Sequence, residues 1–176
     1  TEGFSAALQT LASLGATLEP FDSSGFDVEP IWRAINHTVW RARFAPLVEK
    51  HPDSFSDTFK RQIASAAHVS GVEYQEAMFA RSALFKRVQG LLAKADALVM
   101  PTLTRSALPL GQDLFGTIDI DGQQFDNVRA HWYPWTMLFN MTGHPAISVP
   151  MGFGRDAMPL GLQLVGRFHG DAELLQ

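Results

Sequence analysis

"NMTGHPAISVPMG", residues 140–152, joins a Gly-His-Pro turn to an alternating apolar run that ends at another proline. Gly143 tolerates a positive φ, and Pro145 stiffens the entry into the alternating apolar run that follows. Asn140 and Thr142 are expected to cap and fix this turn rather than to contact a ligand. The stretch therefore predicts a helix end, a tight turn and a strand over residues 146–151.

Other segments on both sides have the composition of strands. "DALVMP", residues 96–101, is a continuous apolar run that ends at a proline, which is typical of a buried strand. "LGLQLVG", residues 160–166, is expected to pair with residues 146–151 across the turn "GFGRDAMP". Asp121-Gly122 in "TIDIDGQQFD" predicts a small hairpin, and "ATLEPF", residues 16–21, alternates like a short strand.

Apolar residues recur at helical spacing in four further segments. These are the segment with Phe4, Leu8, Leu11 and Ala12, a segment capped by Asp27 that ends or kinks near Pro46, residues 56–94 with a break at Ser70-Gly71, and residues 128–140. The order of helices and strands predicts an α/β fold, with a layered mixed sheet flanked by helices. We expect a single globular unit over residues 1–176, with no internal boundary.

Composition excludes several classes of function. The 176 residues are 46% apolar and carry a net charge of −4, with the basic residues dispersed, so we expect no nucleic-acid partner. The longest apolar runs fall short of the roughly 20 residues that cross a bilayer, so we expect no membrane partner. The chain has no cysteine, which excludes disulfides and thiolate zinc sites and fits a cytoplasmic location.

No segment carries a self-contained catalytic motif. There is no zinc-protease motif, no nucleophile elbow and no phosphate-binding loop. "GFGRDA", residues 152–157, matches a dinucleotide fingerprint only superficially, because Met158-Pro159 prevents the helix that the fingerprint needs; Arg155-Asp156 is interpreted as a hairpin tip. The six histidines show no spacing typical of metal ligands. We therefore predict no catalytic residue, no cofactor and no metal within the chain.

Three segments, in order, resemble the C-terminal part of amidase-signature hydrolases. They are "DALVMPT" (residues 96–102), "WTMLFNMTGHPAISVPMGF" (residues 135–153) and "MPLGLQLVGRFHGDAELL" (residues 158–175). "GVEYQEAMFAR", residues 71–81, and "LASLGATLEPF", residues 11–21, resemble earlier parts of the same fold more loosely. The resemblance implies a partial amidase-signature fold over most of the chain.

The resemblance also implies where catalysis would occur. Amidase-signature enzymes use a serine nucleophile, a second serine in a cis peptide bond and a lysine base, all in the N-terminal half of the fold. The two serines lie in a Gly/Ser-rich region, and no region of that kind occurs here. The chain is therefore expected to be the distal portion of the fold and to be inactive alone.

The contribution that the resemblance implies for this chain is a wall of the substrate pocket. The segment before "NMTGHPA" is unusually aromatic, and such walls favour flat or hydrophobic substrates. The expected substrate-binding residues are Trp132, Tyr133, Trp135, Thr136 and Phe139. Ordinary core packing is the alternative for each of them. In glutamine-dependent amidotransferases of the family, an acidic residue holds the amino group of glutamine; an ungapped count back from Asn140 places Tyr133 there, which argues for a more hydrophobic amide.

Three functions remain open from the sequence. The first is the C-terminal part of an amidase that hydrolyses a small-molecule carboxylic amide to the acid and ammonia or an amine. The second is a stand-alone binding or interaction module derived from the amidase fold. The third is part of a glutamine-dependent amidotransferase subunit. Because apolar surface would be exposed without the N-terminal half, we expect the isolated chain to form homo-oligomers or to associate with the missing segments of the fold.

Overall fold

A computed structural model of the chain describes residues 2–155 and 157–176, so the expectation for Asp156 at the hairpin tip lies outside the described residues. Its main sheet has the order β1-β5-β4. The strands are β1 (Leu98–Pro101), β4 (Ala146–Phe153) and β5 (Pro159–Val165). β5 is central: its Gln163 lies between Met100 of β1 and Ser148 of β4. The three strands predicted from the sequence are therefore confirmed.

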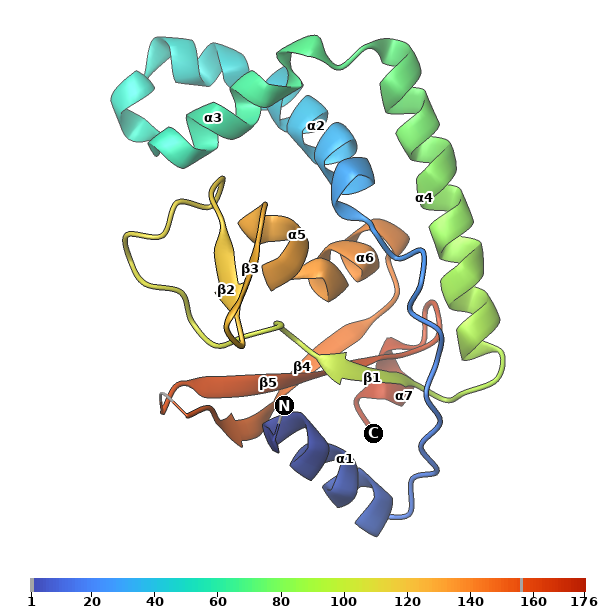
Figure 1. Ribbon diagram of the computed structural model, residues 1–176. Coiled ribbons are helices and arrows are strands. Elements are labelled where there is room, and N and C mark those ends of the chain that lie inside the picture. The colour runs from blue at the N-terminus through green and yellow to red at the C-terminus, as the bar shows by residue number, and fades with distance from the viewer. Residues whose placement is uncertain (1, 156) are drawn as a thin grey trace.

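The two faces of the sheet are covered differently (Figure 1). α1 (Glu2–Ser13) packs below β4 and β5, where an added methyl group on Gly3 would lie 3.0 Å from Leu160. α6 (Pro134–Thr142) lies above the sheet. α2 (Glu29–Lys50) and α4 (Gly71–Leu92) pack against the outer side of α6. The main core lies on this α6 side; its buried residues are Phe26, Val28, Trp32, Leu84, Val88, Leu92, Leu98, Met100, Met137, Leu138, Phe139, Met141 and Val165.

The layered α/β class is confirmed, and every strand pair that the structure describes is antiparallel. The mixture of parallel and antiparallel pairs that we expected does not occur among these strands, because both neighbours of β5 run opposite to it. The small hairpin is confirmed as β2 (Ile118–Ile120) and β3 (Gln123–Phe125). Its turn residues Asp121 and Gly122 have φ of 53° and 83°, as a two-residue turn of this kind requires.

The remaining elements are short. They are η1 (Pro52–Ser54), α3 (Asp57–Ser65), η2 (Ala66–His68), α5 (Val128–Trp132) and α7 (Asp171–Leu174). The prediction of a strand over residues 16–21 is wrong, because this segment has no regular structure and is mostly exposed. Its alternation matches a strand, but no described strand lies beside it to supply hydrogen bonds.

The expected start of α2 is also wrong. Its N-cap is Val28 and not Asp27, and no side chain caps this end. Of the two outcomes expected near Pro46, an end or a kink of the helix, the end does not occur, because α2 continues to Lys50. Pro46 removes a single hydrogen bond to the carbonyl of Ala42, which is exposed and can be hydrated instead. Burial of the inner face at Trp32 and His37 stabilises the helix over its length.

Ser70 begins α4 with a reciprocal pair of hydrogen bonds. The Glu73 amide donates to Ser70 Oγ at 3.1 Å, and the Ser70 amide donates to Glu73 Oε2 at 2.7 Å. These bonds hold the pKa of the Glu73 carboxyl below its usual value. The break predicted at Ser70-Gly71 is thus confirmed as the start of a capped helix.

Replacing Ser70 by alanine is expected to lower the free energy of unfolding by about 1 kcal/mol, because the Glu73 amide loses its acceptor. Urea unfolding followed by circular dichroism measures this change. Ser82→Ala is the matched control, since Ser82 Oγ donates only to the Met78 carbonyl within α4. The control is expected to change stability by less than about 0.5 kcal/mol. Equal losses in both variants would contradict a capping role for Ser70.

Candidate functional site

The aromatic segment before β4 forms two helices joined at Tyr133. Asn127, in the left-handed conformation, begins α5, and its side chain accepts a hydrogen bond from the Ala130 amide at 3.4 Å. Tyr133 has φ −133° and ψ 46°, which ends α5 and precedes α6. The prediction of one helix over residues 128–140 is therefore wrong at this point. The residue before a proline disfavours the helical conformation, whereas Pro134 itself suits the first position of a new helix.

The end of α6 follows the sequence prediction closely. Gly143 has φ 71°, and its amide donates to the Phe139 carbonyl at 2.8 Å. Arg81 of α4 donates from Nε to the Met141 carbonyl at 2.6 Å, which satisfies a second carbonyl at this helix end. His144 follows, buried, with Nδ1 3.0 Å from Thr142 Oγ1, and burial lowers the pKa of its imidazole. These contacts fix the direction in which the chain enters β4.

A pocket of about 400 Å³ opens between α6 and the sheet. Residues of α6 form one side, and residues of β4, of β5 and of the end of β1 form the other. The lining residues are Thr102, Thr136, Phe139, Asn140, His144, Ala146, Ile147, Ser148 and Gln163. The pocket thus lies beside the turn and the strand that follow Asn140.

The sheet side of this pocket is polar. Thr102 Oγ1 and Ser148 Oγ lie 2.6 Å apart in a hydrogen bond that passes over Gly161. A methyl group on Gly161 would lie 2.7 Å from Ser148 Oγ and 2.8 Å from Thr102 Oγ1, so only glycine leaves room for the bond. Gln163 is 5% exposed, and its Nε2 has no hydrogen-bond partner among the described residues. The pocket therefore offers hydroxyl groups and an amide donor to a ligand.

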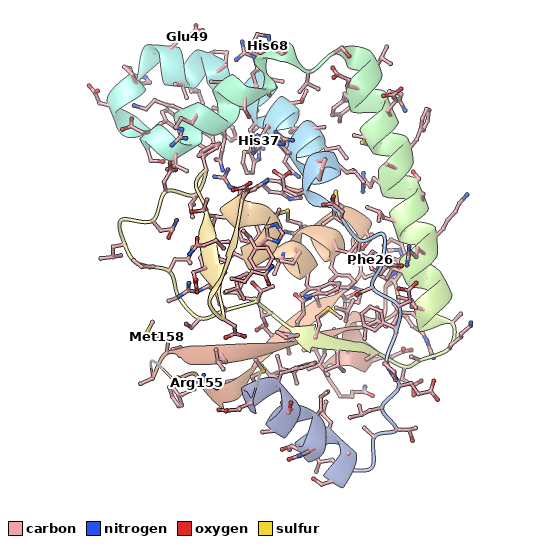
Figure 2. The ribbon with its side chains drawn as sticks, in the orientation of Figure 1. Phe26, His37, Glu49, His68, Arg155 and Met158 are labelled. Carbon is pink, nitrogen blue, oxygen red and sulfur yellow. The ribbon has the colours of Figure 1, made fainter. Side chains whose placement is uncertain are left out.

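The five expected substrate-binding residues do not share this pocket. Thr136 and Phe139 line it. Trp135 packs instead into the core, with its ring centroid 6.3 Å from that of Phe21 and 6.4 Å from that of Phe26. Figure 2 shows Phe26 on the segment before α2, where it passes α4.

Trp132 and Tyr133 lie at the other end of α6, with their ring centroids 5.8 Å apart. Burial raises the pKa of the Tyr133 phenol, while the guanidinium of Arg129 acts in the opposite direction. The phenol is therefore protonated at neutral pH. The carbonyl of Trp132 accepts from the Thr104 amide at 3.0 Å, which fastens α5 to the segment that follows β1. Of the expected substrate-binding residues, Trp132 and Tyr133 thus lie near Arg129 and away from the pocket.

Seven lining residues were missed as site residues, among them Asn140, which was expected only to fix the turn; the others are Thr102, His144, Ala146, Ile147, Ser148 and Gln163. Gln163 is the one with a signal in the sequence, because it is the single polar residue in "LGLQLVG". The positions of Thr102 and Ser148 depend on the register between strands that are far apart in the chain. Sequence spacing alone does not reveal that register.

The pocket has groups for binding but not a set for nucleophilic catalysis. The hydroxyls of Thr102 and Ser148 bond to each other, and that of Thr136 donates to the Tyr133 carbonyl. No lysine occurs among the described lining residues. Within residues 2–155 and 157–176, no group of three acidic or histidine side chains is arranged to hold a metal ion. Over the same residues, no helix is long and apolar enough to cross a membrane.

Comparison with known proteins gives one consistent family. The family model described as Amidase matches residues 1–175. The acylamidase of Rhodococcus erythropolis is 29% identical over 172 residues, which are 97% of this chain and 35% of the acylamidase. A glutamyl-tRNA(Gln) amidotransferase subunit of Halothermothrix orenii is 30% identical over 129 residues, or 70% of this chain and 25% of that protein.

A solved crystal structure of an amidase has the same fold. It superposes with a TM-score of 0.84 at 23% identity, over 99% of this chain and 39% of that chain. The chain thus spans about a third of the acylamidase and a quarter of the amidotransferase subunit.

Proposed function

Because this chain belongs to the amidase family, we propose that it is the C-terminal part of an enzyme that hydrolyses a carboxylic amide to the acid and ammonia or an amine. The observation that carries the proposal is the pocket between α6 and the sheet, which has hydrogen-bonding groups and an apolar side but no nucleophile with a base. The serine nucleophile and the lysine base come from a segment outside residues 1–176. This chain contributes part of the substrate-pocket wall and the core beneath it.

In this proposal the aromatic helices face the substrate. Thr136 and Phe139 line the pocket directly, and Trp132 and Tyr133 extend the wall beyond the start of α6. Trp135 supports the wall from the core side, through its contacts with Phe21 and Phe26. Such a surface favours a flat or hydrophobic amide.

The glutamine-dependent amidotransferase is the second candidate, because the amidotransferase subunit of Halothermothrix orenii matches 70% of the chain. Tyr133 argues against it: its neutral, half-buried phenol has no charge with which to hold the amino group of glutamine. A stand-alone binding module is the third candidate.

We also propose that residues 1–176 act as one unit, that the parent enzyme works in the cytoplasm, and that the isolated chain forms homo-oligomers. The family match over residues 1–175 and the single core shared by α2, α4, α6 and the sheet support one unit. The absence of cysteine supports a reducing compartment. Exposed Phe79, Phe153 and Leu175 support self-association.

The coding sequence upstream of Thr1 tests the proposal. A Gly/Ser-rich region with two serines, preceded by a lysine in the same reading frame, is the expected result. A start codon at this boundary would contradict the amidase proposal and favour the stand-alone module. An acidic residue placed near Tyr133 by alignment with the full parent would favour the amidotransferase.

A further inference from the structure

Two buried donors on α5 have no hydrogen-bond partner among the described residues. They are Nη2 of Arg129 and Nε1 of Trp132. The two residues are three positions apart in one helical segment, so their side chains project from the same side of α5. Arg129 is only 3% exposed. A buried cation and a buried indole N–H of the same short helix thus each have unused hydrogen-bonding capacity.

The guanidinium of Arg129 forms no ion pair with a described carboxylate. Its Cζ lies 4.5 Å from the centroid of the Phe115 ring, and Arg61 approaches the same ring at 4.1 Å. Two cations on one aromatic ring repel each other, so the ring does not compensate the charge of Arg129 fully. A buried guanidinium in this state is costly unless an anion pairs with it.

The carboxylates of this region are engaged elsewhere. Asp113 is bound by Arg61 at 3.0 Å and accepts from the Phe115 amide at 2.9 Å. Glu29, which is buried on α2, pairs with Arg33 at 3.4 Å. Arg129 acts on Asp113 only by lowering the pKa of its carboxyl from a distance, as the last of several causes. Neither carboxylate therefore satisfies Nη2 of Arg129.

The donors lie beside a residue of the proposed substrate wall. Tyr133 follows Trp132 directly, and both the charge of Arg129 and a side-chain hydrogen bond with Arg129 act to lower the pKa of its phenol, which leaves Nη2 of Arg129 as the unpartnered nitrogen. The phenol is a third donor at neutral pH, because burial raises its pKa and keeps it protonated. A carboxylate suits such a set, since it accepts hydrogen bonds from several donors and pairs with a guanidinium through two parallel bonds.

We propose that Arg129 and Trp132 bind a carboxylate of the substrate, so that the preferred substrates are amides that carry an acidic group. This inference rests on the proposed amidase function and adds the substrate class. The carboxylate accepts from Nη2 of Arg129 and from Nε1 of Trp132, and the ion pair neutralises the buried charge. The aromatic wall then contacts the apolar part of the same substrate.

Binding of two probes that differ by one carboxylate tests the proposal. The probes are 4-carbamoylbenzoate and benzamide, and the readout is the indole N–H resonance of Trp132 in ¹H–¹⁵N spectra of the purified chain. With four tryptophans in the sequence, Trp132→Phe identifies the resonance by its disappearance. We expect saturable shifts with 4-carbamoylbenzoate and an affinity for benzamide at least about tenfold lower.

Substitutions at the guanidinium separate charge from packing. Arg129→Gln is expected to weaken 4-carbamoylbenzoate binding at least about tenfold and to leave benzamide binding unchanged, and Arg129→Lys to restore part of the affinity. The matched control is Arg155→Gln: Arg155 is another arginine, at the tip of the β4–β5 hairpin (Figure 2), with a side chain 87% exposed. It is expected to leave both affinities unchanged.

Trp132→Phe provides a second variant that keeps an aromatic ring and removes the N–H. Isothermal titration of this variant should show weaker binding of 4-carbamoylbenzoate than in the wild type and unchanged binding of benzamide. Equal affinities for the two probes, an unchanged affinity in Arg129→Gln, or no shift with either probe would each overturn the carboxylate site. Equal affinities would leave the amidase proposal standing, whereas the lack of a catalytic serine in the parent would overturn that proposal and leave the carboxylate preference measurable.

Discussion

Replacing His37 by phenylalanine is expected to remove about 3 kcal/mol of pH dependence from the free energy of unfolding between pH 6.5 and pH 4. His37 is 1% exposed on α2 (Figure 2), with its ring stacked on Trp40 and edge-on to Trp32. Burial, and then the charges of Arg129 and Arg33, lower the pKa of its imidazole from 6.5 to about 4.

The sign of the effect follows from which state binds the proton. Above pH 6.5 the imidazole is neutral in both the folded and the unfolded chain. Between pH 6.5 and pH 4 the unfolded chain binds a proton that folded His37 does not, so stability falls as the pH falls through this window. Below pH 4 both states are protonated and the contribution of His37 stops changing.

Phenylalanine preserves the aromatic contacts and cannot titrate. The Ser65 hydroxyl already donates to the Gln62 carbonyl, so the substitution removes only the bond between His37 Nδ1 and Ser65 Oγ. At pH 8 the variant is expected to lie within about 1 kcal/mol of the wild type.

Urea unfolding at several pH values, compared with wild type, measures the difference. The control is His68→Asn, because His68 is exposed on η2 and its replacement should change the free energy of unfolding at pH 8 by less than about 0.5 kcal/mol. If His37→Phe loses stability toward pH 4 as steeply as the wild type, the imidazole is not held neutral in the fold.

Replacing Gly161 by alanine is expected to lower the free energy of unfolding by about 2 kcal/mol. The new methyl group would lie 2.7 Å from Ser148 Oγ and 2.8 Å from Thr102 Oγ1, which is closer than non-bonded contact allows. The hydroxyl pair must then separate and lose its hydrogen bond on the floor of the pocket. The effect links the stability of the sheet to the shape of the proposed binding site.

Gly90→Ala is the matched control for this substitution. Gly90 lies inside α4, and a methyl group there would meet no atom within 4 Å, so alanine should stabilise the chain by about 1 kcal/mol. In a second background, Ser148→Ala removes the closest contact, and the cost of Gly161→Ala should fall. An unchanged cost, or a stabilising Gly161→Ala, would contradict the close packing of β5 against its neighbours.

Short sequence patterns predicted the turns and strands whose conformation depends mainly on neighbouring residues. Gly143 was recognisable because a helix end in the left-handed conformation favours glycine, and Asp121-Gly122 because few other pairs make so tight a hairpin turn. The strands at β1, β4 and β5 were visible as apolar or alternating runs between turn residues. The α/β class followed from their order.

Features that depend on contacts between distant segments of the chain could not be predicted from the sequence. The segment from Ala16 to Phe21 alternates like a strand but has no partner strand among the described residues. Pro46 interrupts a helical pattern, yet packing of α2 outweighs the lost hydrogen bond. The break at Tyr133 separates an aromatic run into two helices, and so divides the expected wall into a part beside the pocket and a part beside Arg129.

The candidate site was predicted in position but only partly in composition. The resemblance to amidases pointed to the segment before Asn140, and Thr136 and Phe139 of that segment line the pocket. Gln163 and Arg129 were not singled out, because their unpartnered nitrogens are a property of the folded environment.

Amide hydrolysis is the most direct test of the proposal that residues 1–176 form the pocket wall while another segment supplies the catalytic residues. The measurement is ammonia release from 4-carbamoylbenzoate and benzamide by the purified chain and by the protein encoded by the longest reading frame that contains it. We predict no release above the buffer rate with residues 1–176 alone, and turnover by the longer protein that replacement of its nucleophilic serine abolishes. Turnover by the chain alone, or activity of the longer protein that survives replacement of every serine, would contradict the assignment.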